Sequence, residues 1–185
     1  MKKTLSEMSL EELWQLFPIF LTEHQEQWDT WYEEEAKALY KALPEKCIIR
    51  ISHIGSTAIK NIWSKPIIDI LVEVLRTCNM ARMKETLLQE GYCCMSESEQ
   101  RISFNKGYTE HGFSEKVYHL HLRYDGDHDE LYFRDYLNKN PLLAKQYEAL
   151  KLSLWKKYEH DRDQYTESKT EFVTECTKKA KLETV

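Results

Sequence analysis

The sequence predicts a single α+β domain in which a mixed β-sheet is flanked by N- and C-terminal helices. Three segments indicate strands: Ile48–Ile54 and Ile67–Val74 are rich in β-branched residues, and apolar and polar side chains alternate along Val117–Arg123. Apolar residues recur at helical spacing before and after these segments. The 185 residues, 42% of them hydrophobic, suffice for one packed core. We therefore expect a sheet of about four or five strands within residues 46–125, with helices in 1–45 and 126–185.

The N-terminal segment predicts helices that pack on this core. Ser9 and Glu12 form a capping-box pattern that starts a short helix through Phe17. Pro18 suits the first position of the next helix. A stripe of aromatic and aliphatic residues at helical spacing then continues to Leu43. We interpret the stripe as a core-facing surface, because that is the usual role of such stripes, although aromatic side chains can also stack on bases.

The first predicted strand ends at a turn that suits phosphate binding. Gly55 lets the chain come close to a ligand, and Ser56 or Thr57 can cap a short helix, because a hydroxyl accepts a hydrogen bond from a free N–H group. The N-terminus of such a helix directs N–H groups toward an anion. This turn is therefore a candidate site for a phosphate group.

The second predicted strand carries a carboxylate inside an apolar run. Side chains alternate along a strand, so Asp69 shares a face with Leu71 and Glu73. Glu73 lies roughly 13 Å from Asp69 at ~3.3 Å per residue, which is too far for the two acids to share one ion. An acid in such a run is expected to be paired, bound to a metal or directed into a cleft.

The middle of the chain predicts a helix and two further strands. In chain order they are a helix with its apolar stripe at Met80, Met83 and Leu87, a strand around Tyr92–Met95, and a half-buried strand at Ile102 and Phe104. The segment from Gly107 to Lys116 carries two glycines and three charged side chains, so we expect a loop there.

The strand Val117–Arg123 carries two histidines two residues apart. His119, His121 and Arg123 share one face of it. Two imidazoles placed in this way can chelate one metal ion, because they lie side by side. The alternative is a polar sheet face on which the histidines are hydrogen-bonded.

The C-terminal segment predicts a turn followed by helices. Arg134 lies in an expected helix, where its planar guanidinium can bind two phosphate oxygens or pair with Asp135. Pro141 opens a long helix, and a charged break at residues 159–164 separates it from the last one. Tyr165 and Lys169 share a helix face, and Lys169 is either a phosphate ligand or a solvated side chain.

Several of these segments together resemble the signature of the GrpB-like family. They are His53–Ala58 (HIGSTA), Lys65–Ile70 (KPIIDI), the His-Leu-His strand, Phe133–Leu137 (FRDYL) and the Tyr-x-x-x-Lys spacing. The family is in turn similar to the polymerase-β-type nucleotidyltransferase superfamily. That superfamily combines a Gly-Ser turn with Asp-x-Asp or Asp-x-Glu on a following strand. This chain departs from the pattern at Leu71, where the second acid is expected.

The resemblance implies a nucleotidyltransferase-like fold and a metal-dependent transfer of a nucleoside monophosphate from a nucleoside triphosphate to an unknown acceptor. It implies nucleotide or phosphate binding by Gly55, Ser56, Thr57, Lys65, Arg134 and Lys169, and catalysis and metal binding by Asp69, His119 and His121. The expected cofactor is Mg²⁺ or Mn²⁺. Another transition metal is also compatible, because two imidazoles favour such ions over Mg²⁺.

Two other functions stay open at this point. The loss of the second acid at Leu71 is compatible with a catalytically inactive nucleotide- or phosphate-binding module of the same fold. The Asp–His cluster is also compatible with a metal-dependent hydrolase. Release of pyrophosphate from a nucleoside triphosphate distinguishes the first alternative from a transferase, and activity without any nucleotide would favour the second.

The composition of the chain limits which binding partners and which cellular compartment are expected. The net charge of −5 argues against broad nucleic-acid binding, because no dominant basic field is present to neutralise phosphates. A membrane partner is not expected, since the chain has no long apolar run. The five cysteines form no CxxC pair, and their odd number suits free thiols in a reducing cytoplasm.

Overall fold

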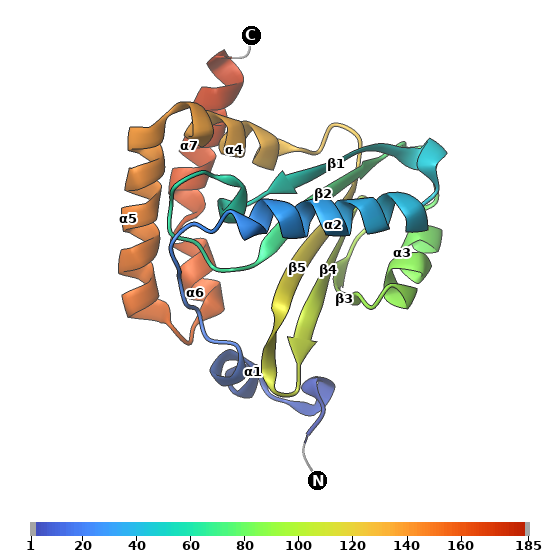
Figure 1. The fold of residues 1–185 in the computed structure, drawn as a ribbon, viewed down its shortest axis with the longest axis horizontal. Coiled ribbons are helices and arrows are strands. Elements are labelled where there is room, and N and C mark those ends of the chain that lie inside the picture. Colours follow the sequence, from blue (N-terminus) through green and yellow to red (C-terminus); the bar gives the residue numbers. More distant parts are fainter. Residues whose placement is uncertain (1–2, 184–185) are drawn as a thin grey trace.

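A five-stranded sheet with the order β1-β2-β5-β4-β3 forms the centre of the molecule in a computed structural model, which describes residues 3–183 (Figure 1). The strands are β1 (Ile48–Ile54), β2 (Ile68–Val74), β3 (Cys93–Glu97), β4 (Arg101–Thr109) and β5 (Gly112–Tyr124). β2 and β5 pair in parallel, whereas the other neighbouring strands are antiparallel. The sheet is therefore mixed, and the predicted α+β class is confirmed.

Two helices cover the more apolar face of the sheet. They are α2 (Gln27–Ala42), which crosses in front of the strands in Figure 1, and α3 (Met80–Gln89). Trp28 and Leu39 from α2 and Met83 from α3 share one core cluster with Ile70 and other side chains of the central strands. The stripe on α2 thus faces the core, as the sequence indicates, because burial of its apolar area stabilises the helix.

The C-terminal helices stack beside the β1 edge of the sheet (Figure 1). They are α4 (Asp129–Lys139), α5 (Pro141–Tyr158), α6 (Arg162–Glu167) and α7 (Thr170–Glu183). A second core cluster joins Phe133, Tyr147 and Cys176 of these helices to Ile59 and Ile62, which follow the turn after β1. This cluster fixes the helices relative to the turn, so the two form one wall of the candidate site.

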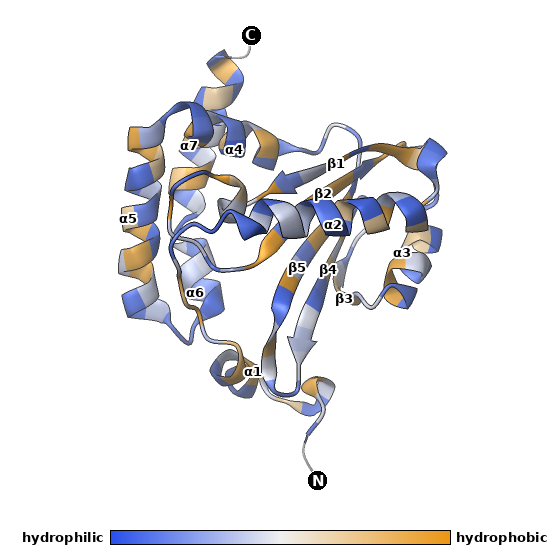
Figure 2. Cartoon of the chain, in the orientation of Figure 1, coloured by the Kyte–Doolittle hydropathy of each residue, from blue (hydrophilic) through white to orange (hydrophobic). Residues whose placement is uncertain are grey.

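The opposite face of the sheet is polar in its centre. Along β5, Tyr118, Leu120 and Leu122 belong to the core cluster, whereas His119 and His121 point to the other side. Figure 2 shows the same alternation as hydrophobic and hydrophilic residues in succession along β5. The candidate site occupies this polar face.

The expectation that Pro18 opens a helix is wrong. The short helix α1 (Leu10–Leu16) ends before it, and α2 begins only at Gln27. The intervening segment has no regular helix and forms an isolated antiparallel bridge between Thr22 and Ser64. Ile19 is buried and its N–H donates to the carbonyl of Glu159. Tertiary partners for the backbone therefore outweigh the local preference of a proline for a helix start.

The expected loop from Gly107 to Lys116 is also absent. β4 and β5 continue through this segment as a hairpin, and Tyr108 pairs with Phe113. The pairing shifts between Lys106 and Tyr108, at a glycine with a φ of 90°. Gly107 thus marks an irregularity inside a strand rather than its end, because glycine adopts this φ at low cost.

The cysteines differ from the expectation of free thiols. Cys47, just before β1, and Cys78, just before α3, form a disulfide, while Cys93, Cys94 and Cys176 are free. The two partners lie 31 residues apart in sequence, and the fold brings the segments together. In residues 3–183, none of the helices has the length and apolar character that a membrane span requires.

Candidate functional site

Gly55 and Asp69 meet where β1 ends and β2 begins. Asp69 is the β-sheet partner of Ile54, and Gly55 has a φ of 71°. A Cβ atom on Gly55 would lie 2.1 Å from Oδ2 of Asp69. Because no side chain fits in that space, glycine at the turn allows the carboxylate its position. The turn and the acid therefore form one structural unit.

Two histidines from β5 approach the Asp69 carboxylate. The parallel register places Asp69 opposite His119 and Leu71 opposite His121. Nδ1 of His119 lies 3.2 Å from Oδ1 of Asp69, and Nε2 of His121 lies 4.0 Å from the same oxygen. Burial raises the pKa of Asp69, but hydrogen bonds from the two histidines outweigh it and hold this pKa well below its usual range. The three residues therefore converge, and the carboxylate is ionised.

His119 uses both of its ring nitrogens within the protein. Its Nε2 lies 2.8 Å from the hydroxyl of Tyr108 on β4, and Arg162 donates a 3.2 Å hydrogen bond to the same hydroxyl. Burial lowers the pKa of His119, and Asp69 partly offsets this effect. Sequence reasoning missed Tyr108 and Arg162, because Tyr108 lies in the expected loop and Arg162 in the charged break.

The donor set around Asp69 fits an ion that is shared with a bound phosphate. Within residues 3–183, Asp69, His119 and His121 are not among the groups whose ligand atoms all lie within 4.8 Å of one another. Leu71, at the position of the expected second acid, packs against Ile54. Protein sites often hold Mg²⁺ through one or two carboxylates together with substrate phosphates. Asp69 and the nearby His121 are suited to that arrangement rather than to a complete protein cage.

A separate group of possible metal ligands lies farther along β2. Glu73, Asp125 and His128 each place one ligand atom within 4.8 Å of the others. The fully buried Glu73 forms an ion pair with Arg50 and lies 2.8 Å from Nδ1 of His128. A metal ion there would compete with Arg50 for the carboxylate. Glu73 therefore has protein partners of its own and is not part of the Asp69 site.

Two lysines lie near Asp69. The ammonium groups of Lys65 and Lys169 lie 5.4 and 4.2 Å from the ring centre of Tyr165. Neither ammonium forms a hydrogen bond or an ion pair with a residue in the described part of the chain. Burial and then the charges of Lys169 and Arg162 lower the pKa of Lys65 to about 7, and burial lowers that of Lys169 to about 8. These cations are suited to a phosphate chain, which would supply the missing partners.

The turn also borders a pocket of about 480 Å³, called the Ser56 pocket below. Its lining comprises Gly55, Ser56, Asp129, Glu130, Phe133, Tyr147, Val173, Thr174, Thr177, Lys178 and Lys181. The volume lies in the range of small-molecule sites, and the lining combines apolar side chains with a few polar groups. The predicted phosphate-binding turn is therefore at the edge of a pocket of suitable size.

Two of the predicted phosphate-binding residues, Thr57 and Arg134, do not line the pocket and form hydrogen bonds within the protein instead. The hydroxyl of the buried Thr57 lies 2.9 Å from Nε2 of His53 and donates to the carbonyl of Ile67. Arg134 donates to the carbonyl of His53 and pairs with Asp135. The structure thus shows the protein-bound alternative for Arg134, and both side chains hold the turn in place.

The fold is nucleotidyltransferase-like. A crystal structure of the Cid1 poly(U) polymerase bound to MgATP aligns with 73% of this chain and 44% of that chain. The TM-score is 0.51 and the sequence identity is 12%, so this likeness concerns the fold alone.

The chain belongs to the GrpB family, whose model, described as GrpB protein, matches residues 18–179. It is 38% identical to the glutamate-rich protein GrpB of Alkalihalophilus pseudofirmus, over 85% of this chain and 92% of that protein. A crystal structure of the conserved protein GrpB from Enterococcus faecalis superposes with a TM-score of 0.75 at 32% identity, covering 87% of this chain and 96% of that one. The chain spans 46% of the UPF0157 protein YqkA of Bacillus subtilis, to which it is 33% identical.

Proposed function

We propose that this protein binds a nucleoside triphosphate with a divalent metal ion at Asp69 and transfers the nucleoside monophosphate to an acceptor. The observation that carries the proposal is the Gly55 turn packed on an ionised Asp69, with the unpaired ammonium groups of Lys65 and Lys169 nearby. The site thus offers negative charge to a metal ion and positive charge to a phosphate chain.

The Ser56 pocket provides room for the nucleotide. The hydroxyl of Ser56 makes no hydrogen bond in the described part of the chain, so it is free to donate to a phosphate oxygen. Lys169 lies at the junction of α6 and α7, and Val173, one helical turn further on, lines the pocket. A triphosphate held by Ser56 and Lys169 would therefore place its nucleoside along α7.

Asp69 would hold the metal ion, with His121 as the nearest further donor. A bound Mg²⁺ or Mn²⁺ supplies Lewis-acid polarisation of the phosphoryl oxygens and offsets charge on the leaving group. Mn²⁺ and other transition metals are compatible with the imidazole, whereas Mg²⁺ prefers oxygen donors. His119 would orient Asp69, because its ring is fixed on the other side by Tyr108.

The reaction is an in-line displacement at the α-phosphorus. An oxygen of the acceptor forms a bond to this phosphorus, and the bond to the bridging oxygen breaks. Pyrophosphate leaves with the electron pair, and the acceptor's proton passes to solvent. The residues of this chain contribute by positioning the triphosphate and by offsetting its charge, which is how proteins usually promote phosphoryl-group chemistry.

A second candidate function is nucleotide binding without catalysis. The specific observation in its favour is Leu71, which packs in an apolar cluster with Ile54 and Leu131 and leaves one carboxylate at the site. An Asp–His metal-dependent hydrolase receives less support, because both ring nitrogens of His119 already have partners in Asp69 and Tyr108.

The test uses the four nucleoside triphosphates labelled at the α-phosphorus, with Mg²⁺ or Mn²⁺ and a small-molecule extract of bacterial cells. The transferase proposal predicts a labelled product and equal release of pyrophosphate, both lost in Asp69→Asn. Metal-dependent nucleotide binding without any product would favour the binding module. Hydrolysis of phosphoesters in the absence of nucleotide would favour the hydrolase.

A further inference from the structure

A second cavity lies on the same sheet face as Asp69, two residues closer to the start of the strands. It has a volume of about 230 Å³, and its lining comprises Pro18, Phe20, Lys65, Pro66, Ile67, Phe113, Ser114, Glu115 and Val117. We call it the Phe113 cavity. Lys65, Pro66 and Ile67 belong to the KPIIDI segment, but the other walls come from the segment after Pro18 and from the β4–β5 hairpin, which local sequence patterns do not bring together.

Register places this cavity next to the candidate site. Asp69 pairs with His119, and Val117 stands two residues before His119 on β5, while Ile67 lies two residues before Asp69, immediately ahead of β2. Side chains two residues apart share a face, and the separation along a strand is about 7 Å. Val117 and Ile67 are buried but do not belong to the core cluster on the opposite face. The floor of the Phe113 cavity therefore continues into the Asp69 site.

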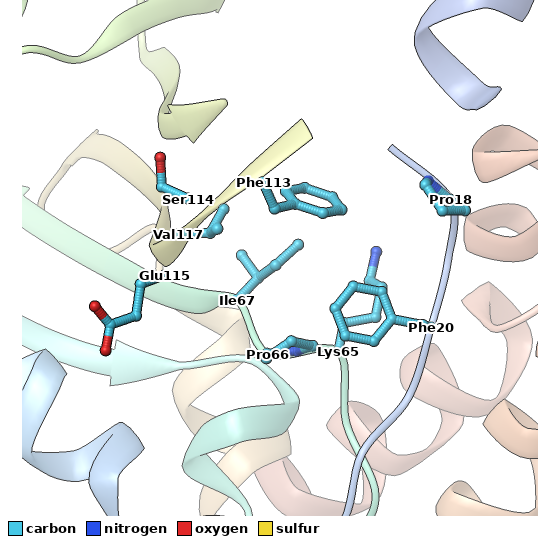
Figure 3. A pocket seen from close by; sticks show the side chains of 9 residues that line it. All are labelled: Pro18, Phe20, Lys65, Pro66, Ile67, Phe113, Ser114, Glu115 and Val117. Atoms are coloured by element: carbon cyan, nitrogen blue, oxygen red, sulfur yellow. The ribbon is translucent and has the colours of Figure 1, made fainter. Parts of the chain in front are cut away.

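The lining of the Phe113 cavity favours a ligand with an apolar or aromatic group. Figure 3 shows the rings of Phe20 and Phe113 with Ile67 between them, while the carboxylate of Glu115 points away. The ring centroids of Phe20 and Phe113 lie 6.1 Å apart with their planes inclined at 58°. Aromatic walls of this kind bind rings through edge-to-face or offset contacts.

One polar group converges on this apolar space. The amine of Lys65 projects among the side chains shown in Figure 3, and Lys65 also faces the charges of Asp69, Lys169 and Arg162. A ligand with a neutral hydroxyl can hydrogen-bond to this amine. A ligand with an ammonium group would meet the positive charge of Lys65, which lines the cavity, so charge complementarity disfavours it.

We propose that the Phe113 cavity is the acceptor subsite of the transferase and that it takes a small molecule with a hydroxyl group on an aromatic or apolar body. This inference rests on the proposed function. In an in-line displacement the acceptor and the leaving pyrophosphate lie on opposite sides of the α-phosphorus. Gly55 and Ser56 line the nucleotide pocket, and Gly55 packs on Asp69, whereas Lys65 lines the Phe113 cavity and faces the charge of Asp69. The two spaces thus meet Asp69 through different segments, and an acceptor in the Phe113 cavity would not have to displace the nucleotide.

Benzyl alcohol is a suitable probe, because it carries one hydroxyl on one ring. We would titrate it into the ¹⁵N-labelled full chain and follow the amide signals, with and without a non-hydrolysable nucleoside triphosphate analogue and Mg²⁺. We expect saturable changes in the amide chemical shifts of Phe113, Ser114 and Val117. These changes should also occur when the nucleotide analogue is bound. Benzylamine at pH 6, where the amine of Lys65 is mostly protonated, should bind at least tenfold more weakly than benzyl alcohol, which tests the charge argument.

Two variants test the location. Ser114→Trp places a large ring at the exposed rim and should weaken benzyl alcohol at least tenfold without weakening the nucleotide analogue. Ser96→Trp makes the same change at an exposed position on β3 and should alter neither. Phe20→Ala removes one aromatic wall and should also weaken the probe, so the result does not depend on one variant folding correctly.

Displacement of benzyl alcohol by the nucleotide analogue would overturn the inference, because it would make the cavity a nucleobase site. Absence of saturable shifts at the cavity, or an unchanged affinity in both Ser114→Trp and Phe20→Ala, would overturn it as well. Failure of the analogue to bind at all would be visible separately at the Ser56 amide. That outcome would overturn the proposed function and the acceptor role with it.

Discussion

The carboxylate of Asp69 occupies the space in which a side chain on Gly55 would stand, since a Cβ atom there would lie 2.1 Å from Oδ2. This contact makes the position of the acid depend on the glycine at the turn. The turn cannot accept another residue while Asp69 points into the site, and the backbone of Gly55 must also adopt a φ of 71°.

Gly55→Ala should therefore be costly for both stability and binding. We expect a loss of about 3 kcal/mol in the free energy of unfolding, because a strained φ and a steric clash add. Gly91→Ala is the matched control, since Gly91 has a φ of 85° but nothing within 4 Å of its added Cβ atom. It should cost about 1 kcal/mol. Equal losses in urea unfolding of the two variants would contradict the role of the contact.

Local sequence patterns sufficed to predict the strand faces. The alternation along β2 and β5 placed Asp69, His119 and His121 on the polar face, and pairing of the two strands brings them together. Gly55 was identified as a turn residue, but its contact with Asp69 depends on how β1 and β2 pair, which a single segment does not reveal.

The rest of the site depends on contacts between segments that are distant in sequence. Tyr108 reaches His119 through the β4–β5 hairpin, and Arg162 reaches Tyr108 from α6. Thr57 has the residue type of a phosphate ligand, yet its hydroxyl is used by His53 and Ile67. Residue type and spacing do not distinguish such a buried hydroxyl from an exposed one, because only the packing of the chain determines its partners.

Glu73→Gln should affect stability rather than ligand binding. The substitution removes the charge of a buried carboxylate that pairs with Arg50 and His128. We expect a loss of about 1–3 kcal/mol in the free energy of unfolding, because the buried side chain would no longer offer a charged acceptor to Arg50 and His128. The metal-dependent part of nucleotide binding should stay unchanged. If calorimetry showed that part to be lost, Glu73 would have to belong to the metal site.

Anion binding at the lysines should weaken as the pH rises. The pKa values of Lys65 and Lys169 are lowered to about 7 and about 8, so both lose positive charge between pH 6 and pH 9. Only the protonated amines attract an anion. Sulfate keeps its charge in this range, and its affinity should fall about tenfold, since one hydrogen bond to a charged group contributes ~1.5 kcal/mol.

Lys169→Met should bind sulfate weakly and with a flatter pH dependence, whereas Lys156→Met, at an exposed position on α5, should behave like the wild type. Titration calorimetry across the pH series measures both. An affinity that is independent of pH in the wild-type protein would argue against these lysines as the anion site.

The disulfide between Cys47 and Cys78 should contribute to stability. Closing a loop of 31 residues lowers the entropy of the unfolded chain, with an expected gain of about 4 kcal/mol. Paired replacement of Cys47 and Cys78 by serine should remove this gain in urea unfolding, and reduction should have no further effect on that variant. Titration of five free thiols in the denatured, unreduced protein would show that the bridge does not form.

The most direct test of the account is the affinity of a non-hydrolysable nucleoside triphosphate analogue, measured by calorimetry with and without Mg²⁺ or Mn²⁺. Wild-type protein should bind in a metal-dependent manner, and analogue at a hundredfold over its Kd should stabilise the fold by ~2.7 kcal/mol, a shift in Tm of about 5–10 °C. Asp69→Asn keeps the shape of the side chain and removes its charge, so it should abolish the metal-dependent part. The same metal dependence in Asp69→Asn would contradict the proposed site.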